Sequence, residues 1–125
     1  MKSGSGKYWL RFRGRPYHGG KLWVYGTLEI LRKIDGTSYY IVNDDGEETL
    51  VREGSICQDT GLVDDYINVI WEGDVLDDHD SGEHYMVYWD DERAMWAVKE
   101  TTTGFTMSLF RFLQTSDAER DEGNP

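Results

Sequence analysis

The chain has 125 residues, which fits one domain or one domain with a small appendage. Its net charge of −11 is unevenly distributed: residues 1–33 contain eight Lys and Arg against one Glu (+7), and residues 34–125 carry −18. The single cysteine excludes an internal disulfide. No apolar run approaches the about 18 residues that a membrane span needs, so we expect a cytoplasmic protein without membrane contact.

The first half predicts an antiparallel β meander. Residues 1–6 are small and polar, and we expect a disordered leader or tag there. Residues 7–13 alternate with a period of two, and residues 21–33 form a long strand whose Gly26 indicates a bulge or a close backbone approach. Asp35-Gly36 and residues 43–46 are hairpin turn signals. We therefore assign residues 7–68 to the meander and a connecting segment, with room for one helical turn near residues 52–65.

The second half predicts further short strands. Residues 69–76, 83–90 and 94–100 have strand character, and residues 105–113 fit either a strand or a short helix. We assign residues 69–113 to a small, SH3-like β-barrel half and residues 114–125 to an acidic flexible tail. The fold class predicted from the whole chain is all-β and mainly antiparallel.

Residues 77–84 contain the densest group of side chains that bind metals in proteins. Oxygen and nitrogen ligands of this kind suit Mg²⁺ or Mn²⁺; here they are Asp77, Asp78, His79, Asp80, Glu83 and His84. Neighbours along a strand point to opposite faces, however, and the spacing does not match a calcium-binding loop. The pattern favours a solvated hairpin end over a metal or catalytic site. We therefore predict no catalytic residue, metal or cofactor, and a protein that is not an enzyme.

Two surfaces are candidates for binding a partner. Acidic hairpin turns can imitate the phosphates of a nucleic acid and contact a basic protein surface; their residues are Asp44, Asp45, Glu47, Glu48, Asp77, Asp78, Asp80, Asp90, Asp91 and Glu92. The alternative is a nucleic-acid contact through cations interleaved with aromatic residues in the first strand, namely Lys7, Trp9, Arg11, Arg13 and Arg15.

Four motifs in order resemble the YopX-like proteins of bacteriophages and prophages. They are RFRGR at 11–15, LWVYG at 22–26, QDTGL at 58–62 and VIWEGD at 69–74. The structural residues of these motifs are Gly14, Gly26, Gly61, Glu72, Gly73 and Asp74. The sequence departs from the family pattern at Asp59, where Tyr is usual, and in the spacer VDDYIN, which lacks an Asn-Gly turn.

The resemblance implies a mostly β protein with a small barrel-like half, often assembled into oligomers, and it implies no reaction. It also implies a location in the cytoplasm of an infected or lysogenic bacterial cell. We expect a phage-encoded accessory protein that contacts a host protein with a basic surface, in its sharpest form an inhibitor of a DNA-binding or defence protein.

Overall fold

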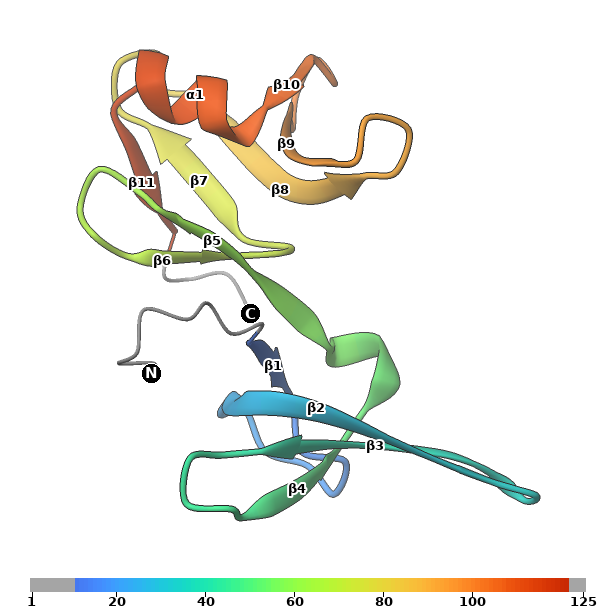
Figure 1. The fold of residues 1–125 in the computed structure, drawn as a ribbon. Helices are drawn as coiled ribbons and strands as arrows, with labels where there is room; N and C mark the ends of the chain where they lie inside the picture. Colours follow the sequence, from blue (N-terminus) through green and yellow to red (C-terminus); the bar gives the residue numbers. More distant parts are fainter. Residues whose placement is uncertain (1–10, 122–125) are drawn as a thin grey trace, which may run out of the picture. The chain divides into compact units, whose positions relative to one another are not determined.

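The computed structural model describes residues 11–121, and these divide into two compact units, Met1–Asp59 and Thr60–Pro125. Both units consist mainly of antiparallel strands, with one short α-helix in the second (Figure 1). The prediction of an all-β, antiparallel protein is confirmed. The two units are described separately below.

Unit 1 is the antiparallel meander expected from the sequence. Its strands follow the order β4-β3-β2-β1, with bounds of Phe12–Gly14 for β1, Val24–Lys33 for β2, Gly36–Val42 for β3 and Glu48–Val51 for β4. A 3-10 turn, η1, spans Glu53–Ser55, in the segment where a helical turn was allowed. The first residues of β5 (Cys57–Val63) then pair with β1.

The β2–β3 hairpin is longer than the strands beside it. β1 pairs with β2 only at residues 24–26, and β4 pairs with β3 only at residues 39–42. The hairpin therefore extends beyond both neighbours, as Figure 1 shows. Within it, Gly26 makes the close backbone approach that the sequence predicted: an added Cβ would lie 1.9 Å from the carbonyl oxygen of Val42.

Unit 2 begins with a hairpin of β5 and β6 (Val69–Trp71). Its loop is organised by the buried carboxylate of Asp64, which accepts N–H bonds from Tyr66, Asn68 and Arg120. Burial alone would raise the pKa of Asp64, but these bonds and one from the Asn68 side chain outweigh it and lower the pKa. The carboxylate thus ties the β5–β6 loop to β11 (Ala118–Arg120).

The main sheet of unit 2 has five antiparallel strands in the order β10-β9-β8-β7-β11. Their bounds are Val75–Asp78 for β7, His84–Asp90 for β8, Met95–Glu100 for β9, Thr106–Ser108 for β10 and Ala118–Arg120 for β11. The sheet has β10 and β11 at its edges, and the SH3-like closure stays a prediction. The expectation of a flexible tail from residue 114 is wrong for residues 114–120, because they contain the end of α1 and β11, which pairs with β7.

Residues 105–113, which fit either a strand or a helix, contain both. The short strand β10 comes first and the helix α1 (Leu109–Thr115) follows it directly. Ser108 caps the helix by accepting the N–H of Arg111 at 3.1 Å. Leu109 and Phe112 lie three residues apart and face the sheet, where they pack on Val87 and Val98 in the core. The rest of this core is Ile70, Leu76 and Ala118.

Candidate functional site

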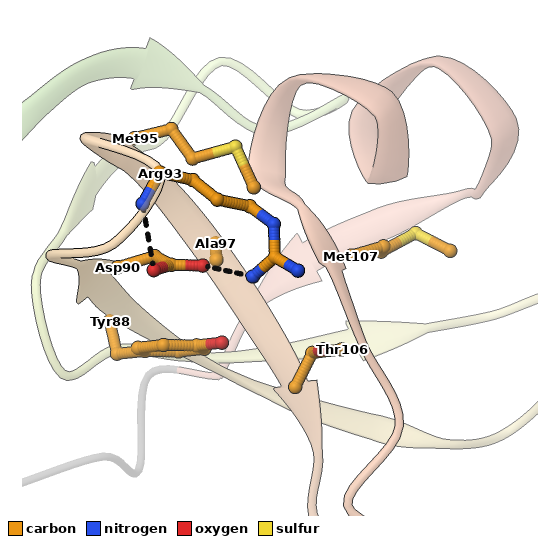
Figure 2. Close-up of a pocket in the computed structure, with 7 residues that line it drawn as sticks. All are labelled: Tyr88, Asp90, Arg93, Met95, Ala97, Thr106 and Met107. Carbon is orange, nitrogen blue, oxygen red and sulfur yellow. Dashed lines mark hydrogen bonds and ion pairs between the residues drawn. The ribbon is translucent and has the colours of Figure 1, made fainter.

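A pocket of about 150 Å³ lies on the side of β8 and β9 opposite the core (Figure 2). Its lining residues are Tyr88, Asp90, Arg93, Met95, Ala97, Thr106 and Met107. In Figure 2 the Arg93 side chain folds back over the pocket, with Tyr88 below it. Tyr88 and Ala97 are directly opposite each other in the β8–β9 register, so the two strands supply the floor.

Asp90 holds the β8–β9 turn together and is not free to contact a partner. Its carboxylate is 8% exposed and accepts a bond from the Arg93 guanidinium at 3.0 Å. The backbone N–H groups of Glu92 and Arg93 also donate to it. The guanidinium of Arg93 and these N–H groups lower the pKa of Asp90. Because the two charges neutralise each other, the pocket has little net attraction for an ion.

Asp78 has the same structural role at the opposite end of β8. It is 9% exposed and accepts bonds from the N–H groups of Asp80 and Asp117 and from the Ser81 hydroxyl. Burial would raise the pKa of Asp78, but the hydrogen bonds prevail and lower it. Asp78 and Asp90, both predicted as contact residues, therefore stabilise turns instead.

The remaining predicted contact residues are spread over three turns. Asp44, Asp45 and Glu47 lie between β3 and β4 in unit 1, Glu48 is the first residue of β4, and all four are exposed. In unit 2, Asp77 and Asp80 belong to the β7–β8 end, whereas the exposed Asp91 and Glu92 lie in the β8–β9 turn. β8 has seven residues, so the two turns of unit 2 are about 20 Å apart. The two turns therefore do not form one continuous contact.

A denser group of charges surrounds the β7–β8 end of unit 2. We call it the histidine–carboxylate cluster: Asp77, His79, Glu83, His84, Glu100, Asp117 and Glu119. His84 Nδ1 lies 2.6 Å from Asp77 Oδ1, and His79 Nε2 lies 2.8 Å from Glu119 Oε1. The strands β7, β8, β9 and β11 bring these residues together.

Like charges face one another within the cluster. Asp77 is directly opposite Glu119 in the antiparallel β7–β11 pair, an arrangement that destabilises a sheet. Glu100 raises the pKa of Glu83, because its side chain accepts a hydrogen bond from the protonated form of Glu83 and its charge repels the ionised form. The two histidines offset only part of this repulsion. The cluster therefore carries an excess of negative charge.

His79 is the group whose protonation responds to the cluster. The hydrogen bond to Glu119 raises the pKa of His79, and the charges of Asp117, Glu119 and Asp77 add to the effect. Its ring also meets the edge of the Tyr66 ring, with centroids 5.8 Å apart. Tyr66 in turn donates its hydroxyl to Asp117 at 3.1 Å, and this bond raises the pKa of Tyr66. A single network thus joins the β5–β6 loop, the residues at the start of β11 and the β7–β8 turn.

Sequence reasoning found only part of this cluster. His79, Glu83 and His84 were recognised as possible ligands, and Asp77 as an acidic contact, but Glu100, Asp117 and Glu119 were not. Asp117 and Glu119 lie in the segment expected to be a flexible tail. β11 has only three residues, and Ala118 is its sole apolar one. No periodic pattern could mark so short a strand.

The basic first strand is largely occupied by contacts inside unit 1. Arg13 is 3% exposed, and its guanidinium carbon lies 4.1 Å from the centre of the Trp23 ring. The guanidinium carbon of Arg15 lies 4.0 Å from the centre of the same ring, and an N–H of this guanidinium donates to the Lys21 carbonyl. Arg11 lies 3.8 Å from the exposed Asp44 carboxylate. Lys7 and Trp9, also predicted contacts, lie outside the described residues.

The residues of the four sequence motifs have structural roles at turns and close contacts. Asp74 is 1% exposed and accepts the Trp71 N–H at 2.8 Å, which closes the turn. Gly73 and Gly61 have φ of 87° and 81°, in the region that favours glycine. Gly14 lies against Val51, where an added Cβ would be 3.1 Å from the valine Cβ. Glu72 is half-buried between Trp71 and Gly73.

No group of three or more His, Cys, Asp or Glu side chains within residues 11–121 is arranged to hold a metal ion. Within the same residues, no helix is long and apolar enough to cross a membrane.

One family model matches the chain, and its description is "YopX protein". The match covers residues 17–117, which is most of the chain and includes both units. No curated protein matches the chain.

Proposed function

Because the chain belongs to the YopX protein family, we propose that it is a non-enzymatic, phage-encoded accessory protein that acts by contacting another protein. The contact surface in this proposal is the histidine–carboxylate cluster of unit 2. A basic surface on a host protein is the matching partner. The family assignment itself specifies no reaction, and the proposal requires none.

The repulsion within the cluster carries this proposal. Asp77 faces Glu119, and Glu83 faces Glu100, without enough cations of the protein itself to neutralise them. A Lys or Arg side chain of a partner would relieve this repulsion as well as form new ion pairs. Binding would thus gain from charges that destabilise the free protein.

The charge of the whole unit extends this attraction beyond the cluster. Residues 60–125 contain sixteen Asp and Glu against four Lys and Arg, a formal net charge of −12. A field of one sign accelerates encounters with a partner of opposite sign. Proteins that bind nucleic acid present such a partner surface, because Lys and Arg neutralise the phosphates. The sharper proposal is therefore an inhibitor whose carboxylates occupy the phosphate-binding positions of a host DNA-binding or defence protein.

Affinity capture from a bacterial host lysate tests the proposal. The test variant combines Asp77→Asn, Glu83→Gln, Glu100→Gln and Glu119→Gln. The matched control removes four carboxylates of unit 1 by Asp44→Asn, Asp45→Asn, Glu47→Gln and Glu48→Gln. We expect the wild-type protein and the control to capture the same basic protein, and the test variant to lose it while keeping its far-UV circular dichroism spectrum.

Equal capture by both variants would contradict the role of the cluster. A single-stranded DNA gel shift with the wild-type protein tests the alternative function, which is nucleic-acid binding by the basic first strand. We expect no shift; a shift that Arg11→Ala and Arg15→Ala abolish would show that the basic strand is the functional surface instead.

A further inference from the structure

A groove of about 410 Å³ in unit 1 has a lining unlike that of the acidic cluster. It runs along one end of β3 and β4 and is lined by Tyr17, Thr37, Ser38, Tyr39, Leu50, Val51 and Glu53. Its volume is within the range of binding sites for small ligands and short peptide segments. All of its residues belong to unit 1, so the groove is complete within one unit.

An open strand edge forms one side of the groove. In the β2–β3 hairpin Lys33 is opposite Gly36, and a pair flanking a two-residue loop bonds to each other with both N–H and C=O groups. The pattern alternates from there, so the N–H and C=O of Thr37 point away from β2, toward the side on which β4 pairs with Tyr39. β4 ends at Val51, and η1 turns the chain away at Glu53. No other strand within residues 11–121 pairs with this side of β3 at Gly36–Ser38.

The other sides of the groove supply aromatic surface and one fixed charge. Tyr17 is 59% exposed, and Leu50 holds it in place by accepting the Tyr17 N–H at 2.8 Å. The hydroxyl of Tyr39 donates to Glu53 Oε2 at 3.2 Å. This bond orients the Glu53 carboxylate, and Val51, which is 2% exposed, closes the base. The groove thus combines an apolar base, two tyrosines, an unpaired strand edge and a carboxylate.

We propose that this groove binds an extended peptide segment of another protein, which adds as a strand to the edge of β3 at Thr37. Backbone bonds to the Thr37 N–H and C=O would fix the register, as in other cases of strand addition. A Lys or Arg side chain of the segment pairs with Glu53, and an adjacent apolar side chain packs between the two tyrosines on Leu50. Only about three residues of β3 are open, so the expected affinity is weak, in the micromolar range or above.

This site is independent of the proposed function. It uses backbone hydrogen bonds and one carboxylate in unit 1, whereas the proposed function uses the carboxylate cluster of unit 2. Either can fail while the other holds. The test therefore uses the full chain carrying the four cluster substitutions described above, so that attraction of a cationic peptide to unit 2 is reduced.

The probe is a hexapeptide of alternating lysine and valine, titrated into the ¹⁵N-labelled protein at near-physiological salt. We expect amide shifts concentrated at Thr37, Ser38, Tyr39 and Glu53. A hexapeptide of alternating glutamate and valine should produce none of them, because Glu53 repels it. The change Glu53→Gln should weaken binding about threefold, since it removes one solvent-exposed ion pair. The matched control Glu48→Gln, an exposed carboxylate of the same unit, should leave it unchanged.

Thr37→Pro tests the strand edge itself. Proline removes the outward N–H without removing a bond to β2, so the hairpin keeps its ladder. We expect binding of the lysine–valine peptide to fall about fivefold while the amide spectrum of β2 is retained. Shifts along the open edge of β2, equal binding of both peptides, or equal effects of Glu53→Gln and Glu48→Gln would each overturn the proposal.

Discussion

The conformation of Ile67 is the clearest strain at the scale of a single residue. Its φ is 67°, and it is 77% exposed in the β5–β6 loop. Left-handed backbone costs about 1–2 kcal/mol for residues other than glycine, and a β-branched side chain is the least suited to it. Packing of the Ile67 side chain offsets little of this cost, because the side chain is in solvent.

Ile67→Gly should therefore stabilise the protein. We expect the free energy of unfolding to rise by about 0.5–1 kcal/mol, which is the relief of strain less the added entropy of the unfolded chain. Urea denaturation measures this. The matched control is Val69→Gly, an exposed β-branched residue that lies in β6, and it should lower stability by about 1 kcal/mol. If Ile67→Gly lowered the free energy of unfolding as Val69→Gly does, the proposed strain at Ile67 would be contradicted.

The ion pair of His79 and Glu119 makes stability depend on pH. The hydrogen bond to Glu119 raises the pKa of His79 above its unfolded value of 6.5. A raised pKa means that the folded protein holds the proton more tightly, so the stabilisation is complete below pH 6.5 and is lost as pH rises through the folded pKa. His79→Gln should therefore lower the melting temperature at about pH 6 but not at about pH 9.

The carboxylate partner supplies the control for this prediction. In a Glu119→Gln background the same histidine substitution should have a much smaller effect at low pH, because the two groups act as a pair. An effect of His79→Gln that is equal at both pH values would show that the ring stabilises by packing against Tyr66 instead.

At the scale of elements, the close approach of β2 to the end of β3 depends on Gly26. Its Cα approaches the backbone of Val42 so closely that a methyl group would overlap the carbonyl. Gly26→Ala should cost at least about 3 kcal/mol, because backbone atoms of a paired strand cannot move aside cheaply. Gly46→Ala is the control: its φ is 82°, but nothing lies within 4 Å of an added Cβ. It should cost about 1–2 kcal/mol in chemical denaturation; equal losses would contradict the close approach.

The elements also show which parts of the fold were readable from the sequence. The hairpins of unit 1 were predicted because Asp35-Gly36 and residues 43–46 are turn signals between strands of alternating character; the first loop is Ile34-Asp35, and Gly36 already belongs to β3. β11 was missed because three residues contain no periodicity, and its position depends on pairing with β7, which is distant in sequence. The sequence of α1 fits a strand or a helix, and in the structure it is a helix that Ser108 caps.

The candidate site was harder to predict than the fold for a related reason. Acidic residues in turns resemble one another in sequence, yet Asp78 and Asp90 are buried turn acceptors and Asp80 and Asp91 are exposed. Hydrogen-bond partners decide the difference, and most of them are main-chain N–H groups, whose positions follow from the folded turn. The cluster itself required the β7–β11 pairing, which placed Glu119 opposite Asp77.

At the scale of the whole molecule, charge is divided by unit. Residues 1–59 contain nine Lys and Arg against eight Asp and Glu, a net charge of +1, whereas residues 60–125 carry −12. In the sequence the charge divides into a basic start and an acidic remainder. In the structure it divides into a nearly neutral unit 1 and a strongly acidic unit 2. The two proposals match this division, since strand addition in unit 1 uses backbone groups and the proposed contact in unit 2 uses charge.

The salt dependence of binding to the captured partner tests the central proposal most directly. Calorimetry at about 50 mM and about 300 mM NaCl would compare the wild-type protein with the variant that lacks four cluster carboxylates. If the cluster contacts a basic surface, wild-type affinity falls at least about tenfold across this range, and the variant binds weakly with a much smaller dependence on salt. Wild-type affinity that is unchanged by salt, or a variant that matches the wild type at both concentrations, would contradict the account.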